Sequence, residues 1–278
     1  MSETRRAFRQ FLRHRGAVIG SVIVLVFVAI ALLADVLSPH DPLAQDLVHR
    51  LEAPSATHWL GTDDFGRDVL SRVLHGSRVS LRLGLVAVAV ALLVGGTIGL
   101  LTGYYGGWLD LIAMRVMDLM LAFPSILMAI VVVAILGPSL TNAMIAVGIM
   151  AVPQYARIVR ASVLSVRGLE YVQASRALGA ADPRILARAI LPNIAGPIIV
   201  TASLGLATAI LDAAGLSFLG LGAQPPIPEW GSMLSQGREL VLVAPWVLTA
   251  PGVAVFLAVL GFNLVGDALR DLLDPRRT

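Results

Sequence analysis

The stretch from Leu119 to Ala156, LMLAFPSILMAIVVVAILGPSLTNAMIAVGIMAVPQYA, decides the fold, because it is long, apolar and free of charged residues. A helix crosses the hydrocarbon core of a bilayer with about 20 predominantly apolar residues, so this run holds two such helices. Gly137 and Pro138 lie between its two apolar halves and form a strong turn signal. The run therefore predicts two membrane spans joined by a very short loop.

Four more apolar stretches of spanning length lie outside this run. Hydrophobic residues make up 57% of the chain and charged residues only 14%, with a mean hydropathy of +0.82, which excludes an ordinary soluble domain. The six candidate spans are residues 16–34, 83–103, 113–136, 139–156, 194–219 and 246–265.

We therefore expect an all-α fold, a polytopic transmembrane helical bundle with six spans. Its parts are a tail at 1–15, a first helix with an outer loop at 16–82, and a core at 83–278 that includes segment 171–193 and loop 222–246. The first span is interpreted as a retained anchor, not a cleaved signal peptide. Its apolar stretch is longer than the usual signal core, and no small-x-small cleavage site follows it.

All basic residues of the chain are arginines, and their placement predicts the orientation. With six spans, 15 arginines fall on the side of both termini and 6 fall on the other side. Basic residues accumulate in cytoplasmic loops, so both termini and segment 171–193 are predicted to be cytoplasmic. This topology and the attraction of arginine to acidic lipid account for the net charge of +3 without a nucleic-acid partner.

Segment 171–193, YVQASRALGAADPRILARAILPN, resembles a helix-turn-helix placed between two spans. Gly179 is suited to end a first short helix in the left-handed conformation. Asp182 is suited to cap a second helix, and Pro183 to begin it. We expect this second helix to run to Leu191 and to stop at Pro192, so that the segment forms a compact cytoplasmic knob.

The knob resembles the cytoplasmic coupling segment, often called the EAA loop, of ATP-binding-cassette (ABC) importer permeases. Three further blocks, residues 58–81, 216–239 and 261–276, together with the turn at 103–110, resemble the second, C-type permease of the peptide and nickel branch. The matches to the EAA pattern are Gln173, Ala174 and Ser175 at its start, Gly179 at its glycine, and Leu191 and Pro192 at its end. Gln173 replaces the family's glutamate, and Ser175 replaces its second alanine.

This resemblance implies a type I ABC importer permease fold in a bacterial or archaeal cytoplasmic (inner) membrane. It implies that the knob docks in a groove of a nucleotide-binding ATPase subunit, where its arginines would pair with acidic groups at the rim. The residues assigned to this contact are Gln173, Ala174, Ser175, Arg176, Ala177, Gly179, Asp182, Arg184, Arg188, Leu191 and Pro192. The alternative from the residues alone is an amphipathic helix that lies on anionic lipid.

The chain has no glycine-rich nucleotide loop and no lysine, so it is expected to be no enzyme and to bind no cofactor itself. The implied partners are two ATPase subunits that use ATP and magnesium, a second related permease that completes a heterodimer, and an extracytoplasmic binding protein. The implied cargo is a dipeptide or oligopeptide, or a related solute such as a nickel chelate or glutathione. The competing classes are an ion-gradient-driven transporter or channel and a membrane scaffold.

Several other residues are candidates for roles in the pathway or at the outer surface. Asp118 and Asp212 lie in or near spans, where charge is costly, and are assigned to the pathway or a gate. Gly95, Gly99 and Gly103 share one helical face and favour close helix packing, within the subunit or between subunits.

Binding-protein docking is assigned to Asp63, Asp64, Pro225, Pro226 and Trp230. Residues 67–78 are expected to form an interfacial helix. The five histidines lack the spacing of a metal site.

Overall fold

The computed structural model describes residues 14–273, so most of the predicted tail at 1–15 lies outside the described residues. The described residues form helices and no strand, apart from one isolated bridge between Thr62 and Asp68. The helices are α2 (Arg15–Leu37), α3 (Val69–Tyr105), α4 (Gly107–Leu121), α5 (Ser125–Leu136), α6 (Leu140–Val166), α7 (Glu170–Ala177), α8 (Asp182–Ile185), α9 (Leu191–Phe218), α10 (Trp230–Gly237) and α11 (Pro245–Leu273), with 3₁₀ turns at Leu47–His49 and Arg238–Leu240 and a π turn at Leu186–Ile190.

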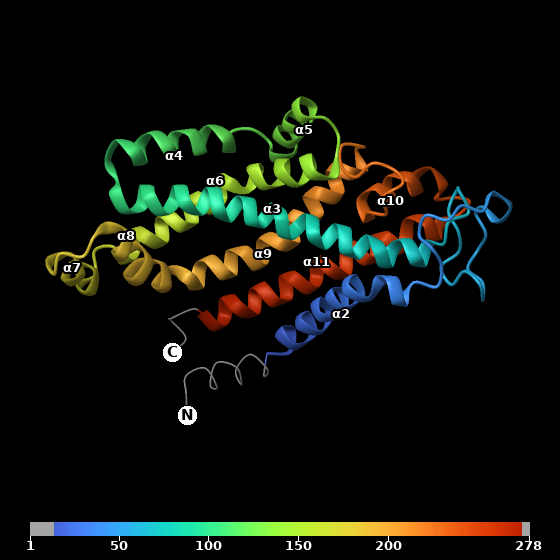
Figure 1. The fold of residues 1–278 in the computed structure, drawn as a ribbon, viewed down its shortest axis with the longest axis horizontal. Helices are drawn as coiled ribbons and strands as arrows, with labels where there is room; N and C mark the ends of the chain where they lie inside the picture. Colours follow the sequence, from blue (N-terminus) through green and yellow to red (C-terminus); the bar gives the residue numbers. More distant parts are fainter. Residues whose placement is uncertain (1–13, 274–278) are drawn as a thin grey trace.

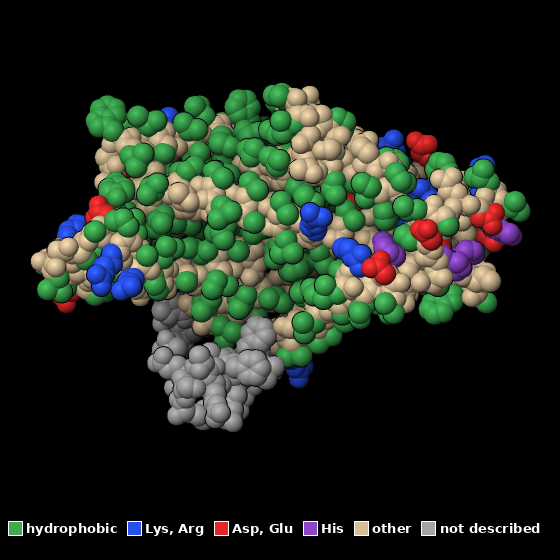
Figure 2. All heavy atoms as spheres, in the orientation of Figure 1, with side chains coloured by type: hydrophobic (Ala, Val, Ile, Leu, Met, Phe, Trp, Pro, Cys, Tyr) green, Lys and Arg blue, Asp and Glu red, His purple; other side chains and the backbone are tan. Residues whose placement is uncertain are grey.

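The long helices run along one axis of the molecule and form the membrane bundle (Figure 1). Helix α3 lies at its centre and packs against α2, α6 and α9, while α11 packs against α2 and α9. Helices α7 and α8 project at one end, here called the α7 end, and α10 lies with loop 38–68 at the other, the α10 end. Apolar side chains cover the middle of the visible face, and charged side chains gather at both ends (Figure 2). The predicted all-α transmembrane bundle is confirmed.

The third predicted span is not one straight helix. Helices α4 and α5 are together long and apolar enough for one span, but their axes differ by 95° at a short break. Pro124 lies in this break and has no N–H to donate, and its ring disfavours a helical conformation for Phe123. Five single helices are therefore long and apolar enough to cross a membrane, and the bent pair makes up to six.

Two further boundaries differ from the sequence prediction. Residues 67–78 do not form a separate interfacial helix, because α3 begins at Val69 and continues without a break to Tyr105. Similarly, the helix that begins at Asp182 does not stop at Pro192 but continues through a π turn into α9, so that residues 182–218 form one long element. Proline cannot donate to the regular i to i−4 ladder, and the π turn just before Pro192 is a local departure from that ladder.

The glycines of α3 allow this helix to pack directly on the backbone of α6. A Cβ atom added to Gly95 would lie 2.4 Å from the carbonyl oxygen of Val152, and one added to Gly99 would lie 2.3 Å from that of Ala156. A Cβ atom added to Gly103 would lie 2.8 Å from the Cβ atom of Val163 and 3.0 Å from the carbonyl oxygen of Arg160, both in α6. Of the two explanations for this stripe, packing within the subunit is confirmed.

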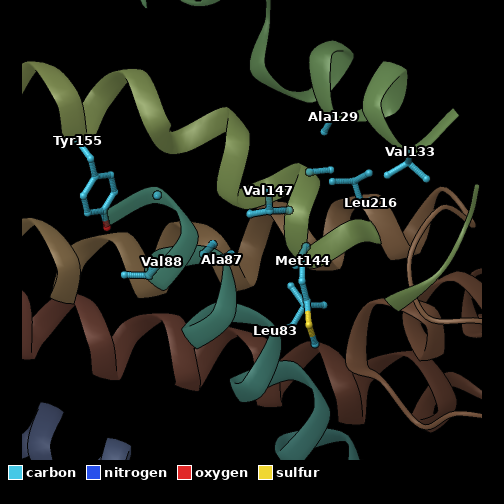
Figure 3. Close-up of a cluster of buried hydrophobic side chains, with 13 residues drawn as sticks. Leu83, Ala87, Val88, Ala129, Val133, Met144, Val147, Tyr155 and Leu216 are labelled. Atoms are coloured by element: carbon cyan, nitrogen blue, oxygen red, sulfur yellow. The ribbon is translucent and has the colours of Figure 1, made fainter. Parts of the chain in front are cut away.

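The largest buried cluster lies where α3, α5, α6 and α9 meet (Figure 3). Leu83 and Ala87 of α3 face Met144 and Val147 of α6, while Leu216 comes from α9. Val133 and Ala129 bring α5 into the same cluster. Because α5 is joined to the bundle through these side chains, the break at Pro124 leaves α5 folded back against the core instead of continuing the direction of α4.

Candidate functional site

An elongated cavity of about 500 Å³ lies among α3, α6, α9 and α11. Most of its lining is apolar, and its polar side chains include Gln154, Thr201, Thr208, Asp212 and Arg270. Gly196 and Asp212 mark its extent on α9, and at 1.5 Å per residue they lie about 24 Å apart along the helix. The cavity therefore extends over most of the thickness of a bilayer core and has the dimensions of a solute pathway.

Tyr155 is a side chain of the cavity that sequence reasoning missed. Its hydroxyl donates a hydrogen bond to the carbonyl oxygen of Thr201, at 3.3 Å. The ring fits only because Gly205 has no side chain, since a Cβ atom there would lie 2.1 Å from the Tyr155 hydroxyl. A glycine on α9 thus admits an aromatic side chain from α6, and this pairing is not visible in either local sequence.

The structure separates the two acidic residues that were grouped as pathway or gate candidates. Asp212 lines the cavity and makes no hydrogen bond or ion pair with any other residue between 14 and 273. Asp118 lies on α4 and forms an ion pair with Arg157 of α6, with both side chains about half exposed. Asp212 thus lines the cavity, while Asp118 joins two helices.

The α7–α8 segment is anchored firmly to the ends of α3 and α6. A buried apolar cluster contains Val172 of α7 and Ile185 of α8 together with Val159 and Val163 of α6. The hydroxyl of Tyr104, at the end of α3, donates a 2.6 Å hydrogen bond to the carboxylate of Asp182. The segment is therefore a rigid projection of the bundle and not a flexible linker.

The two helix ends below this segment are also joined to each other. The guanidinium group of Arg167 donates to the carbonyl oxygen of Gly103 at 2.8 Å, and so occupies an acceptor at the C-terminus of α3. Arg160 of α6 forms a two-bond ion pair with Asp110 of α4. Movement of the α7–α8 segment would therefore be transmitted to α3, α4 and α6 together.

The opposite face of this segment is open. Leu178 at its tip is 88% exposed, and Gly179 beside it has a positive φ of 79° with no atom within 4 Å of an added Cβ. The predicted contact residues Gln173, Ala174, Ala177, Arg184, Arg188, Leu191 and Pro192 are also exposed, and Ser175 is half-buried. The segment thus presents small and apolar groups flanked by arginines.

One predicted role within the segment requires correction, and a second residue of the segment makes a contact that was not predicted. Asp182 is the first residue of α8 and not its N-cap, which is Ala181; its carboxylate is used instead by Tyr104. Arg176 lies with its guanidinium carbon 5.5 Å from the centre of the Tyr104 ring, so part of its cationic surface is directed at its own chain. The side-chain interaction with Tyr104 raises the pKa of Arg176.

At the α10 end, two residues predicted to contact a docked protein are buried. Trp230 is 0% exposed and donates from its indole N–H to the carbonyl oxygen of Val73 at 3.0 Å. The carboxylate of Asp63 accepts from Arg67 at 2.7 Å and lies 3.4 Å from Arg72, with all three side chains almost fully buried. Such burial leaves Asp63 and Trp230 no surface for a partner. Asp64 is partly exposed, and Pro225 and Pro226 are exposed.

The histidines at this end are closer than their spacing suggested. His40 and His58 come from different parts of loop 38–68, and both direct Nδ1 toward the same carboxylate oxygen of Asp68. Sequence reasoning missed this cluster, because the separations of 18 and 10 residues match no metal-site motif and depend on the path of a non-helical loop.

Comparison with known proteins identifies the family. Residues 95–278 match the family described as "Binding-protein-dependent transport system inner membrane component". The chain belongs to this family. In addition, residues 2–54 match the "N-terminal TM domain of oligopeptide transport permease C".

Individual relatives agree with this assignment. The chain is 51% identical to the dipeptide transport system permease protein DppC of Alkalihalophilus pseudofirmus, over 99% of this chain and 91% of the relative. It is 48% identical to the glutathione transport system permease protein GsiD of Pectobacterium atrosepticum, over 98% and 91%. An inward-facing structure of the MetNI methionine ABC transporter is similar in fold, with a TM-score of 0.60 at 20% identity, over 72% of this chain and 96% of that one.

The chain is therefore a multi-pass inner-membrane permease subunit of an ABC importer, with the type I permease fold. ABC importer permeases are not enzymes, and the ATPase activity of such a system lies in separate subunits. Membership also implies that the subunit works with ATPase and binding-protein partners. The EAA-type resemblance of residues 171–193 is thus consistent with the family of the whole chain.

Proposed function

We propose that this permease carries dipeptides or oligopeptides, or a peptide-like solute such as glutathione, and that the cavity among α3, α6, α9 and α11 is its half of the pathway. Two observations support the cargo class: the relatives include dipeptide and glutathione permeases, and the cavity combines an apolar wall with separated polar groups. Asp212 and Arg270 place one acidic and one basic group in the wall of the cavity, so a zwitterionic peptide would meet both signs of charge along its path.

The observation that carries the coupling mechanism is the anchoring of the α7–α8 segment by Tyr104 and Asp182. In this proposal the small and apolar tip around Leu178 and Gly179 enters a groove of an ATPase subunit, and Arg184 and Arg188 pair with acidic groups at its rim. When ATP and magnesium close the two ATPase subunits, the rigid segment moves with them. Because it is packed on α3 and α6, it shifts two walls of the cavity and switches access.

This mechanism requires a defined orientation and assembly. Both termini and the α7 end face the cytoplasm, and the α10 end faces outward, where exposed groups such as Asp64, Pro225 and Pro226 meet the binding protein. A second, non-identical permease completes the pathway, and the assembly holds one permease heterodimer with two ATPase subunits. Arginine placement in the sequence supports the orientation.

Cysteine cross-linking tests the docking step, because the chain has no native cysteine. Ala177→Cys should cross-link in high yield to a cysteine placed in the groove of the ATPase subunit, and the yield should change when nucleotide is added. Ala56→Cys, at an exposed site of the α10 end, is the matched control and should give no such product. Failure of Ala177→Cys to cross-link in an actively transporting complex would exclude the proposed contact.

Reconstitution separates the importer from a gradient-driven carrier. Liposomes that hold the purified complex should take up a labelled dipeptide only with ATP and the binding protein present. Uptake by this chain alone, driven by an ion gradient without ATP, would contradict the proposed mechanism. Copurification of a second permease of different sequence would support the heterodimer, and recovery of this permease alone with the ATPases would indicate a homodimer.

A further inference from the structure

The α10 end contains a cluster of side chains that transport does not explain. His40, His58 and Asp68 place one potential metal-ligating atom each within 4.8 Å of one another. The Nδ1 atom of His58 lies 2.9 Å from Oδ1 of Asp68, and that of His40 lies 3.8 Å from the same oxygen. Around a tetrahedral zinc ion with bond lengths near 2.1 Å, neighbouring ligand atoms are about 3.4 Å apart. The observed distances lie on either side of this value.

The carboxylate of Asp68 is held in position by other contacts. Its second oxygen, Oδ2, accepts from the backbone N–H of Ser71 at 2.7 Å and from the Ser71 hydroxyl at 2.6 Å. Asp68 is almost fully buried, so its Oδ1 is directed at the two imidazoles and not at solvent. Hydrogen-bonded supports of this kind orient the ligands of protein metal sites.

The two histidines are also held by the backbone. The N–H of His40 donates to the hydroxyl of Ser71 at 3.2 Å, and the N–H of His58 donates to the hydroxyl of Ser55 at 3.1 Å. Their rings lie close together, with centroids 4.6 Å apart and planes tilted by 31° to each other. Both rings direct Nδ1 toward the same carboxylate oxygen, so one cation could be shared between them.

The surroundings favour a cation. A cup of about 450 Å³ opens beside the cluster, and its lining includes Asp41, Asp46, His49 and Glu52 but no arginine. Figure 2 shows histidine and acidic side chains gathered at this end of the molecule. The open side of the cup leaves space for water as a fourth ligand. Two imidazoles and one carboxylate form a donor set suited to zinc and similar transition metals, in contrast to the all-oxygen sets of calcium and magnesium.

We propose that His40, His58 and Asp68 form a binding site for a divalent transition metal, with zinc as the ion that fits best. The bound metal links loop 38–68 to the N-terminus of α3. This site is independent of the proposed cargo and of the coupling mechanism, because neither the cavity nor the α7–α8 segment contributes to it.

The test uses the full-length chain, with its purification tag removed, in detergent and after treatment with a chelator. Equilibrium dialysis against micromolar zinc should give one tightly bound zinc per chain. His40→Gln and His58→Gln should each weaken zinc binding by more than about 100-fold, since loss of a supporting group alone costs 10 to 100-fold. His49→Gln is the matched control: it removes a histidine of the same cup, which pairs with Asp46, and should leave zinc binding unchanged.

Two further measurements, thermal unfolding and cobalt absorption, distinguish the loss of a metal ligand from misfolding of a variant. Zinc should raise the thermal unfolding temperature of the native chain and of His49→Gln, but not of His40→Gln, whose exposed side chain can be replaced without opening the core. Cobalt in place of zinc should give the visible absorption of a tetrahedral site. Absence of stoichiometric zinc, equal loss in His49→Gln, or preference for calcium over zinc would each overturn the proposal.

Discussion

The hydroxyl of Tyr104, at the end of α3, donates a 2.6 Å hydrogen bond to the carboxylate of Asp182, the first residue of α8. This contact joins residues 78 positions apart and fixes the α7–α8 segment to the central helix of the bundle. A charge-assisted hydrogen bond of this kind holds the segment in one orientation, which any mechanical coupling through it requires.

Tyr104→Phe should therefore loosen the α7–α8 segment without unfolding the bundle. Loss of a hydrogen bond to a charged group should cost about 1.5–3 kcal/mol locally, which raises the population of the opened segment at least about tenfold. Trypsin should then cleave after the exposed Arg184 correspondingly faster. Tyr171→Phe is the control, since the Tyr171 hydroxyl has no hydrogen-bond partner among residues 14–273. Equal cleavage rates in both variants would mean that the Tyr104 contact does not hold the segment.

The contact between α3 and α6 predicts an unusual sensitivity to one methyl group. Gly99→Ala would place a Cβ atom 2.3 Å from the backbone oxygen of Ala156, so the helices must separate. Overpacking of this kind costs about 1–3 kcal/mol and should lower the thermal unfolding temperature in detergent. In Gly96→Ala, the nearest atom is a side-chain carbon of Leu92 at 3.5 Å. This second variant should be neutral or slightly stabilised, because alanine favours helix over glycine by up to about 1 kcal/mol.

The cavity provides a third prediction, which concerns transport and not stability. Gly205→Ala would force the Tyr155 side chain out of its place, since the added Cβ would lie 2.1 Å from the Tyr155 hydroxyl. If the cavity is the pathway, ATP-driven uptake should fall several-fold while the complex still assembles. Gly215→Ala lies on the same helix and would make only an ordinary contact at 3.8 Å, so uptake should be retained. Normal uptake in Gly205→Ala would remove the cavity from the pathway.

The spans could be predicted from sequence because hydropathy is a local property, and each long apolar stretch indeed became a helix or a bent helix pair. Hydropathy does not show where a helix axis changes direction, however. The break at Pro124 was therefore not predicted, although a proline is visible in the local sequence. Helix α3 was predicted too short because Arg72 and Ser71, polar residues of its first turns, are buried by tertiary contacts that no window of sequence reveals.

The residues of the candidate site also fall into those that a local sequence pattern predicts and those that only the fold brings together. The α7–α8 segment was found because its glycine, proline and arginine pattern is contiguous. The cavity and the histidine cluster were not, because Tyr155 meets Gly205 and His40 meets Asp68 only after distant segments fold together. Burial also reversed the expected roles of Asp63 and Trp230, which are polar or amphipathic residues that sequence alone places at the surface.

Asp63 and Asp64 are adjacent acidic residues with opposite predicted effects. Asp63 is buried with Arg67 and Arg72, so Asp63→Asn leaves two buried guanidinium groups without their shared countercharge. Breaking a buried ion pair by removing one partner costs about 3–5 kcal/mol. Because the asparagine side chain would keep an acceptor for the backbone N–H groups of Phe65 and Arg67, the loss measured in thermal unfolding reports mainly the charge.

Asp64→Asn should instead be neutral or stabilising. Burial, and next to it the charge of Asp63, raise the pKa of the Asp64 carboxyl, and its buried Oδ1 accepts no hydrogen bond within the described residues. A carboxyl group whose pKa is higher in the folded state destabilises that state as the pH rises from the unfolded toward the folded pKa. The advantage of the Asp64→Asn variant should therefore be complete at neutral pH and disappear below about pH 4, the ordinary range of an aspartate. Thermal unfolding of both proteins across pH measures this difference, and an advantage that instead grew as the pH fell would show that Asp64 is stabilised in its charged form.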